Sequence, residues 1–430
     1  MNINSRGIKP YMAVEPDFRA DIVQTSLPNY AIIPLPPDSG EEILVRIGER
    51  IREGQIISKG KNAVHASIPG VVRKIISITL PDKTESLAVQ IKLDGFFDYT
   101  GKHEKYFNWS SLQPSSIIRT IQKNGLVQLD GSGENLSTLL ENCRKSATKT
   151  IIVNAANGTP FLSSEIRILQ EHPEKIATAL QILHYILPVK HTIFAATKIQ
   201  YAQKFLEHVL KTDIRMKTKR VPEKYPAGSS HEIIRSLPQN HSQNRSSSLQ
   251  TVVLNISTLL SLYEGIVLNK SLIEKIITVG GGAFGKSTTV KARIGTPLRK
   301  IFQELGGLQK TPVKIVVGIP LRGHEVTDID TPLSKEITSI FALQSDEMGA
   351  ASQSPCINCG VCVDHCPADL EPLTLHKLLD NNRYEEALSR GLMSCWSCGI
   401  CSHVCPSYIP LTRIIEDGML TVKKEGLLES

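Results

Sequence analysis

Apolar and polar positions alternate along the first part of the chain. Residues 45–57 alternate around glycine turns, and residues 64–72 repeat the pattern. A period of two is typical of half-buried β-strands bounded by turns. Residues 31–93 are therefore predicted to be all-β.

The pattern changes to α/β between residues 116 and 237. Ile151–Val153 is a short apolar strand, residues 164–187 carry a helical stripe that Pro173 divides into two pieces, and Thr192–Ala196 is a further strand. Strand–helix–strand order favours a parallel sheet. Residues 238–249 are polar and predicted to form a loop.

A second small unit follows from residue 251 to the apolar strand that ends at Val317. Within it, residues 280–287 satisfy the P-loop formula G-x4-G-K-[ST]. A P-loop needs a helix directly after it, so that backbone N–H groups point at phosphates. Residues 288–297 are instead β-branched and broken by glycine and proline, which predicts a strand. The glycines are expected to turn a hairpin, and nucleotide hydrolysis is not expected.

The remaining chain is predicted to be a linker, residues 318–354, followed by a helical domain, residues 355–430. Pro372 suits a first helical turn, Leu375, Leu378 and Leu379 form an apolar stripe, and Gly391 is a natural helix stop. The whole is a multidomain α+β protein with expected domains at 1–100, 101–237, 251–317 and 355–430.

Composition limits the class of protein. Among 430 residues, 41% are hydrophobic and 21% charged, as in ordinary globular proteins. The net charge of +7 suits an anionic lipid surface or an acidic electron carrier, but the dense basic runs of nucleic-acid binders are missing. Residues 1–20 lack the apolar core of a secretory signal. The longest apolar stretch, residues 176–196, contains Pro188 and several polar residues, so no membrane span is expected.

Cysteine spacing carries the strongest chemical signal. The pattern C-x2-C-x2-C-x3-C-P occurs twice, and its cysteines are Cys356, Cys359, Cys362 and Cys366, then Cys395, Cys398, Cys401 and Cys405. Three closely spaced thiolates can surround one corner of an iron–sulfur cube, while the fourth, before proline, normally binds the other cluster. We therefore expect two [4Fe–4S] clusters with crossed ligands. One is held by Cys356, Cys359, Cys362 and Cys405, the other by Cys395, Cys398, Cys401 and Cys366.

Two other uses of these cysteines were weighed. Structural zinc prefers two separated pairs of ligands, and disulfides need an oxidising compartment. Neither explains a doubled motif of this length. Cys143 is left over and is assigned no role, because a lone thiol is usually a small packed residue. Reduced cysteines, with no signal or span, place the chain in the cytoplasm.

The order of these pieces resembles the C subunit of the Rnf electron-transport complex over nearly the full length. Residues 31–93 resemble the barrel-sandwich fold of lipoyl domains, without the lysine that is modified there, and His65 is expected to be packed rather than a ligand. The middle domain resembles the flavin subunit of respiratory complex I. Residues 293–298 match a β-grasp (SLBB-type) module, and the cluster motifs are the most specific match.

The resemblance implies FMN and NADH binding, yet the matching segments differ from the family. The glycine-rich turn, residues 128–136, keeps Gly131 and Gly133 but carries Asp130 and Glu134, which would repel a phosphate. The second motif begins at Asn154 and lacks both acidic residues. The third contains Lys224 and Tyr225, and Ser230 replaces a glutamate.

Two mechanisms remain open. In the first, a peripheral subunit on the cytoplasmic side of the bacterial inner membrane exchanges electrons between NAD(H) and ferredoxin, as part of an ion-translocating oxidoreductase with membrane partners. FMN would carry the hydride chemistry. In the second, the flavin site is lost, and the chain is a two-cluster conduit or docking subunit that receives electrons from ferredoxin or flavodoxin. A purely structural subunit is disfavoured, because a scaffold needs no redox centres.

Overall fold

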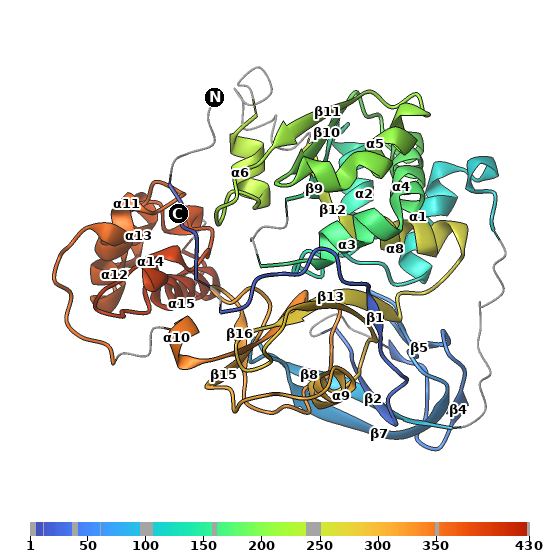
Figure 1. The fold of residues 1–430 in the computed structure, drawn as a ribbon, viewed down its shortest axis with the longest axis horizontal. Coiled ribbons are helices and arrows are strands. Elements are labelled where there is room, and N and C mark those ends of the chain that lie inside the picture. The colour runs from blue at the N-terminus through green and yellow to red at the C-terminus, as the bar shows by residue number, and fades with distance from the viewer. Residues whose placement is uncertain are drawn as a thin grey trace.

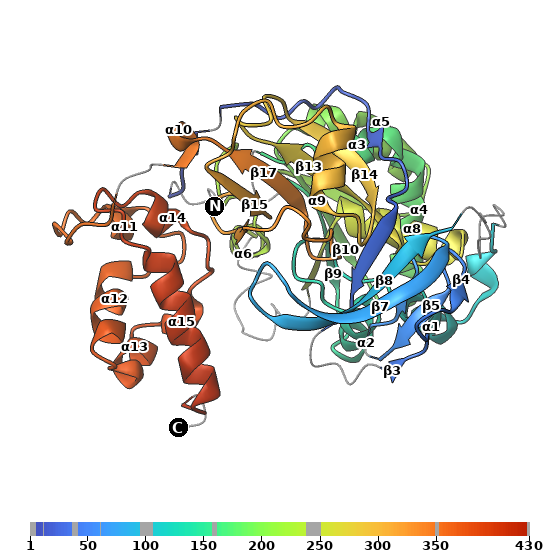
Figure 2. The ribbon, with the colours of Figure 1, turned by 90° about the horizontal axis from the view of Figure 1, so that it is seen from below.

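The computed structural model describes residues 6–11, 13–36, 42–60, 62–94, 106–156, 161–237, 251–348 and 352–427. Figure 1 shows a β-rich part at the lower right, an α/β part above it and a helical lobe at the left. Figure 2 shows the same lobe beside the other two parts. The predicted loop 238–249 and residues 157–160 of the second motif lie outside the described residues.

Two small antiparallel sheets form the N-terminal part, with the orders β2-β8-β7-β4 and β3-β5-β6. The strands are β2 Tyr30–Pro34, β3 Glu42–Ile43, β4 Arg50–Ile51, β5 Ile56–Lys59, β6 Val64–His65, β7 Gly70–Thr79 and β8 Glu85–Leu93. Ala31 and Ile33 are fully buried in β2, as the alternating pattern predicts. His65 is buried, and burial lowers its pKa to about 3, so it is a packed residue.

The α/β part contains a four-stranded parallel sheet of order β11-β10-β9-β12, which confirms the predicted sheet type. Its strands are β9 Thr150–Ala155, β10 His191–Ala196, β11 Met216–Arg220 and β12 Thr251–Asn255. Every residue of β9 is buried, because helices cover both faces of a parallel sheet.

The helices of this part are η1 Trp109–Ser111, α1 Pro114–Lys123, α2 Leu136–Lys145, α3 Ser164–Glu171, α4 Pro173–Ile186, η2 Ile199–Ala202, α5 Gln203–Leu210, α6 Ser230–Arg235 and α8 Ile256–Val267. The predicted break at Pro173 is confirmed, because α3 ends at Glu171 and Pro173 starts α4. Proline lacks the N–H that would continue α3, but it fits the first turn of the next helix.

A six-stranded mixed sheet lies below the α/β part, with the order β1-β14-β13-β17-β15-β16. Its elements are β1 Val23–Gln24, β13 Glu274–Gly280, β14 Thr288–Arg293, α9 Leu298–Glu304, β15 Lys314–Val317, β16 His324–Val326 and β17 Ser339–Leu343, followed by α10 Ser345–Met348.

The P-loop formula falls on the turn between β13 and β14. These strands pair antiparallel, with Val279 opposite Thr288, and Gly281 and Gly285 have φ of 108° and 75°. A Cβ at Gly281 would lie 2.3 Å from the carbonyl oxygen of Ala342, so only glycine fits there. The predicted hairpin is confirmed.

Two of the expected domain boundaries are wrong. Residues 251–267 do not start a new unit, because β12 extends the parallel sheet and α8 packs against α4 within it. The expected linker 318–354 contains β16 and β17, and β17 lies between β13 and β15 in the mixed sheet. Both boundaries depend on strands that pair across distant segments of the chain. Such pairing cannot be recognised from amino-acid composition.

The C-terminal lobe is helical, as predicted. It contains α11 Val361–Asp364, α12 Pro372–Asp380, α13 Tyr384–Ser389, η4 Leu392–Ser394, α14 Ile400–His403 and α15 Leu411–Lys424. Leu375, Leu392 and Ile415 are buried at the centre of its core. Gly391 has φ of 83° just after α13, in keeping with a helix stop. Among the described residues, no helix has the length and apolar character needed to cross a membrane.

An N-terminal segment, residues 6–25, crosses all three parts and appears as the dark blue trace in Figure 1. Ile8 exchanges two backbone hydrogen bonds of 2.9 Å with Tyr225 of the α/β part. The N–H of Ala13 donates to Glu347 Oε1, and β1 pairs with β14 of the mixed sheet. The segment therefore fixes these parts relative to one another.

A buried charge network joins the N-terminal sheets to the mixed sheet. Arg293 lies 3.0 Å from Glu53 and 3.2 Å from Glu274, and all three side chains are at most 8% exposed. Burial alone would raise the pKa of Glu274, but Lys270, Arg293 and Lys291 hold it at about 2. Leaving one of these buried charges without its partner is costly.

We expect Glu53→Ala to lower the free energy of unfolding by about 3 kcal/mol, because it leaves part of the buried charge of Arg293 uncompensated. Urea unfolding followed by circular dichroism measures this as a lower midpoint. Glu325→Ala is the control, because Glu325 pairs with Lys314 at the surface and should shift the midpoint little. Equal midpoints for the two variants would contradict the role of the network.

Candidate functional site

Four cysteines from the two halves of the lobe line one small pocket. They are Cys366, which follows α11, and Cys395, Cys398 and Cys401 around α14. Burial raises the pKa of Cys401 to about 12, and the neighbouring Cys398, Cys395 and Cys366 add to that rise. Burial likewise raises the pKa of Cys398 to about 11, and coordination to a metal would deprotonate these thiols.

The other four cysteines differ in their exposure to solvent. Cys356 and Cys359 are exposed, whereas Cys362 is buried in α11. Burial raises the pKa of Cys362, and nearby Cys359 contributes. Cys405 packs against the apolar cluster that contains Cys362 and Cys401. The two groups of thiols are therefore neighbours.

The backbone repeats as closely as the sequence does. Asn358 and Ser397, two residues after the first cysteine of each motif, have φ of 55° and 50°, and each donates its N–H to that cysteine's sulfur at 3.4 Å. Gly360 and Gly399, two residues further on, have φ of 76° and 82° and begin α11 and α14. Sequence analysis missed Asn358 and Ser397, although their equal positions in the two motifs could have revealed them.

This arrangement fits iron–sulfur clusters. Thiolates are the preferred ligands of such clusters, and N–H groups directed at sulfur help to set their reduction potentials. Among the described residues, no three His, Cys, Asp or Glu side chains are arranged to hold a single metal ion.

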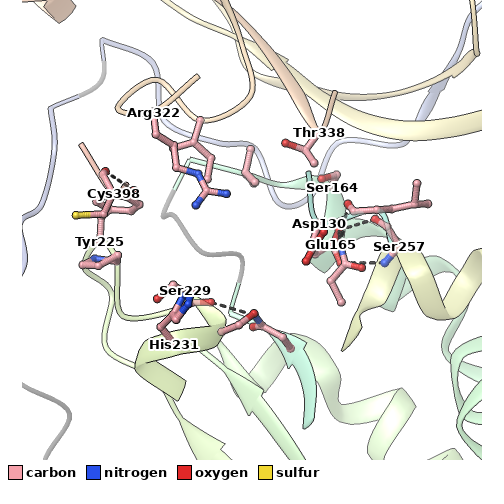
Figure 3. Close-up of a pocket in the computed structure, with 18 of the residues that line it drawn as sticks. Asp130, Ser164, Glu165, Tyr225, Ser229, His231, Ser257, Arg322, Thr338 and Cys398 are labelled. Carbon is pink, nitrogen blue, oxygen red and sulfur yellow. Dashed lines mark hydrogen bonds between the residues drawn. The ribbon is translucent and has the colours of Figure 1, made fainter. Parts of the chain in front are cut away.

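A cavity of about 210 Å³ opens beside the cysteines, between the α/β part, the mixed sheet and the lobe. Asn154 and Tyr225, two of the predicted cofactor-binding residues, line it together with Asp130, Arg322 and Cys398. Figure 3 shows Tyr225 and Cys398 on one side of the cavity and Asp130 on the other. The hydroxyl group of Tyr225 donates a hydrogen bond to the carbonyl oxygen of Cys398. The cavity and one cysteine group therefore share a wall.

The other predicted cofactor residues lie elsewhere. Gly131 and Gly133 line a neighbouring cavity of about 410 Å³, which shares Asp130 and Arg322 with the first. Lys224 precedes Tyr225 in the chain, is half-buried and lines neither of these two cavities.

The glycine-rich loop does not fit the phosphate of FMN. The N–H of Ser132 donates to Asp130 Oδ1 at 2.9 Å, and the N–H of Glu134 donates to Ser132 Oγ at 3.3 Å. A Cβ at Gly133 would lie 2.9 Å from the carboxylate oxygen Oε1 of Glu336. Phosphate binding by such loops needs free N–H groups, whereas this loop bonds two of its own to its side chains and faces carboxylates.

Glu165 is a cavity residue that sequence analysis missed, because a glutamate in a helix usually faces water. Its carboxylate is buried, and accepts hydrogen bonds from the N–H of Ser257 at 2.9 Å, from the Ser257 hydroxyl and from Asn255 Nδ2 at 3.2 Å. Burial raises the pKa of Glu165 to about 7, against the lowering effect of the Ser257 hydrogen bonds. The cavity therefore holds a group that titrates near neutral pH.

Comparison with known proteins agrees with this organisation. Residues 4–96 match the RnfC barrel sandwich hybrid domain, residues 121–264 the Nuo51 FMN-binding domain and residues 355–409 the 4Fe-4S dicluster domain. The C subunit of the ion-translocating oxidoreductase complex from Yersinia enterocolitica is 30% identical over 90% of this chain. The C subunit from Yersinia pestis is also 30% identical over 90%. Over nine tenths of its length the chain is thus similar to C subunits of ion-translocating oxidoreductase complexes, and its first domain matches the RnfC model.

The 4Fe-4S dicluster domain at residues 355–409 contains both cysteine motifs, and it carries two 4Fe-4S clusters. The chain spans only 57% of the Yersinia enterocolitica protein and 64% of the Yersinia pestis protein. An NAD+-reducing [NiFe]-hydrogenase in its H2-reduced state has a TM-score of 0.51 and 13% identity, and the match covers 75% of this chain and 62% of that one. This similarity shows a shared fold.

The titration of Glu165 predicts a pH dependence. Its pKa is about 7 in the fold against an ordinary 4.5, so the unfolded chain releases this proton first as the pH rises. Stability should therefore fall between these two values, by up to about 1.4 kcal/mol per pH unit, and then level off. Glutamine does not titrate, so the stability of Glu165→Gln should not fall in this pH range. Its thermal midpoint should therefore rise relative to that of the parent as the pH increases from 5 to 7.

Thermal unfolding of both proteins between pH 5 and 8 checks this expectation. Glu207→Gln, at an exposed position of α5, is the matched control and should stay parallel to the parent. If Glu165→Gln also stays parallel, Glu165 is already ionised at pH 5 and the expected burial effect is wrong.

Proposed function

We propose that this chain is an iron–sulfur electron-transfer subunit of an ion-translocating Rnf-type oxidoreductase. The observation that supports it best is the doubled cysteine motif, repeated in backbone conformation and in N–H···S contacts. Such a subunit would associate peripherally with the membrane partners of the complex, on the cytoplasmic side of a bacterial inner membrane.

The ligand sets are proposed to be crossed. Cys366 would complete the cluster of Cys395, Cys398 and Cys401, because it shares their pocket. Cys405 would complete the cluster of Cys356, Cys359 and Cys362, because it packs against the apolar cluster that contains Cys362 and does not line the pocket of the inner group. When bound, each cluster supplies one-electron chemistry. The protein's residues would hold the thiolates, direct backbone N–H groups at the sulfurs of Cys356, Cys366 and Cys395, and exclude water from the inner group.

The electron donor separates two versions of this function. Exchange between NAD(H) and ferredoxin would need FMN in the α/β part. The carboxylates around the glycine-rich loop favour the alternative, in which the chain is a conduit that has lost this chemistry and receives electrons from a carrier such as ferredoxin or flavodoxin.

We propose that the domains have different roles in electron transfer. The N-terminal barrel-sandwich module and the mixed sheet, with its β-grasp (SLBB-like) segment around residues 293–298, would support the α/β part and dock partners. The helical domain from residue 355 onward would carry the electrons.

Replacing single cysteines tests the crossed ligands. In protein reconstituted with iron and sulfide, Cys366→Ser and Cys398→Ser should weaken or remove the same cluster, while Cys405→Ser should affect the other one. Iron and sulfide content, with EPR of the reduced protein, identifies which signal is lost. Cys143→Ser is the control, because Cys143 is buried in α2, and it should retain about eight irons per chain. Loss of the same signal from Cys366→Ser and Cys405→Ser would refute the crossing.

An anaerobic titration tests the donor. With FMN added, dithionite should reduce both clusters and NADH should reduce neither, since the loop does not fit the phosphate. The family's turn resembles G-L-G-G-A-G-F-P-T, and the matched variant Asp130→Gly with Glu134→Phe restores its residues at the two acidic positions. A gain of FMN binding in this variant would support the explanation. Cluster reduction by NADH in the unmodified chain would instead support the NAD(H)-dependent version.

A further inference from the structure

Three charged residues from distant parts of the chain meet beside the inner cysteine group. Asp369 follows Cys366 by three residues and forms ion pairs with Arg6, in the N-terminal segment, and with Arg235, at the end of α6, the latter at 3.1 Å. Arg6 also donates to the carbonyl oxygen of Cys366 at 3.3 Å. Both guanidinium groups are thus directed at the loop that presents Cys366.

The same α6 also contacts the second half of the cysteine repeat. Trp396 stands between Cys395 and Ser397, and its ring stacks on His231 with centroids 5.3 Å apart and an angle of 15°. The guanidinium of Arg235 lies 5.2 Å from the centre of the Trp396 ring, within cation–π range. Arg235 therefore touches one loop through Asp369 and the other through Trp396.

These contacts differ from ordinary surface ion pairs. The side chains of Arg6, Arg235 and Asp369 are 35%, 36% and 59% exposed, so a single pair would contribute little. Here two cations share one carboxylate, and each makes a further contact with a ligand loop. Arg235 also pairs with the buried carboxylate of Glu232 at 2.7 Å, so Asp369 and Glu232 balance the two positive charges. Any electrostatic effect on the inner cysteine group therefore depends on how near the guanidinium groups are to the ligand loops.

We propose that Arg6 and Arg235 are positioning residues for the inner cluster, which rests on the proposed iron–sulfur function. They hold the loops of Cys366 and of Cys395–Cys401 against the α/β part, and their charge raises the reduction potential of that cluster. Reduction adds one electron to the cluster without breaking a bond, so nearby positive charge stabilises the reduced state.

Redox titration of the cluster-loaded full chain, followed by EPR, tests this proposal. Arg6→Gln and Arg235→Gln should each shift the midpoint potential of one cluster downward and leave the other in place. Asp369→Asn should shift the same cluster upward, because it removes the negative charge between the two arginines. A merely structural role would loosen the loops in all three variants and would not produce opposite signs.

Lys424→Gln is the matched control, because it removes one exposed positive charge at the far end of α15. It should move neither potential appreciably. If a glutamine variant loses iron, Arg6→Lys and Arg235→Lys take its place. Because they keep the charge but not the planar group, they should hold the potential near that of the parent.

The outcomes separate the two proposals. If the parent chain cannot be loaded with two clusters, the iron–sulfur function itself fails. If it loads both clusters but the arginine variants shift neither potential, or shift both equally, the positioning role is wrong. Lysine variants that shift as far as the glutamine variants would also overturn the electrostatic part of the proposal.

Discussion

The pocket that Cys366 shares with Cys395, Cys398 and Cys401 is the constraint on which the helical lobe depends. It requires the end of the first motif to return to the second across nearly thirty residues of chain. Helices α12 and α13 provide this return, and Leu375 and Leu392 bury the connection against Ile415 of α15. The lobe therefore needs an apolar core of its own in addition to the two cysteine motifs.

The same pocket explains how the lobe meets the rest of the molecule. Its outer wall is the loop around Cys398, which accepts a hydrogen bond from Tyr225. Tyr225 is in turn held by backbone hydrogen bonds to Ile8. Segments from the beginning, middle and end of the chain thus converge within a few residues of one cysteine group. Such convergence gives a fixed distance between the cavity and the cysteines, which electron transfer requires.

Local patterns and distant contacts were not equally predictable. The break at Pro173, the hairpin at Gly281 and the doubled cysteine motif depend on neighbouring residues, and sequence analysis identified all three. The joining of β12 to β9, and of β17 between β13 and β15, depends on strands that pair across the chain. The approach of Glu336 to Gly133 is similar, since about two hundred residues separate them. Neither the spacing of residues along the chain nor the composition predicts contacts between such distant segments.

The glycine-rich loop shows how such a loop can keep its conformation when no ligand is bound. In a loop built for phosphate, the anion would satisfy the backbone N–H groups, and losing it would leave them without partners. Here Asp130 takes that role for Ser132, and Ser132 takes it for Glu134. Two N–H groups of the loop are thus satisfied within it, and Asn255 Nδ2 donates to the neighbouring Leu129 carbonyl oxygen as a further support. Because the substituted carboxylate does the work of the anion, the α/β part can keep its shape and still hold the inner cysteines in place without a bound flavin.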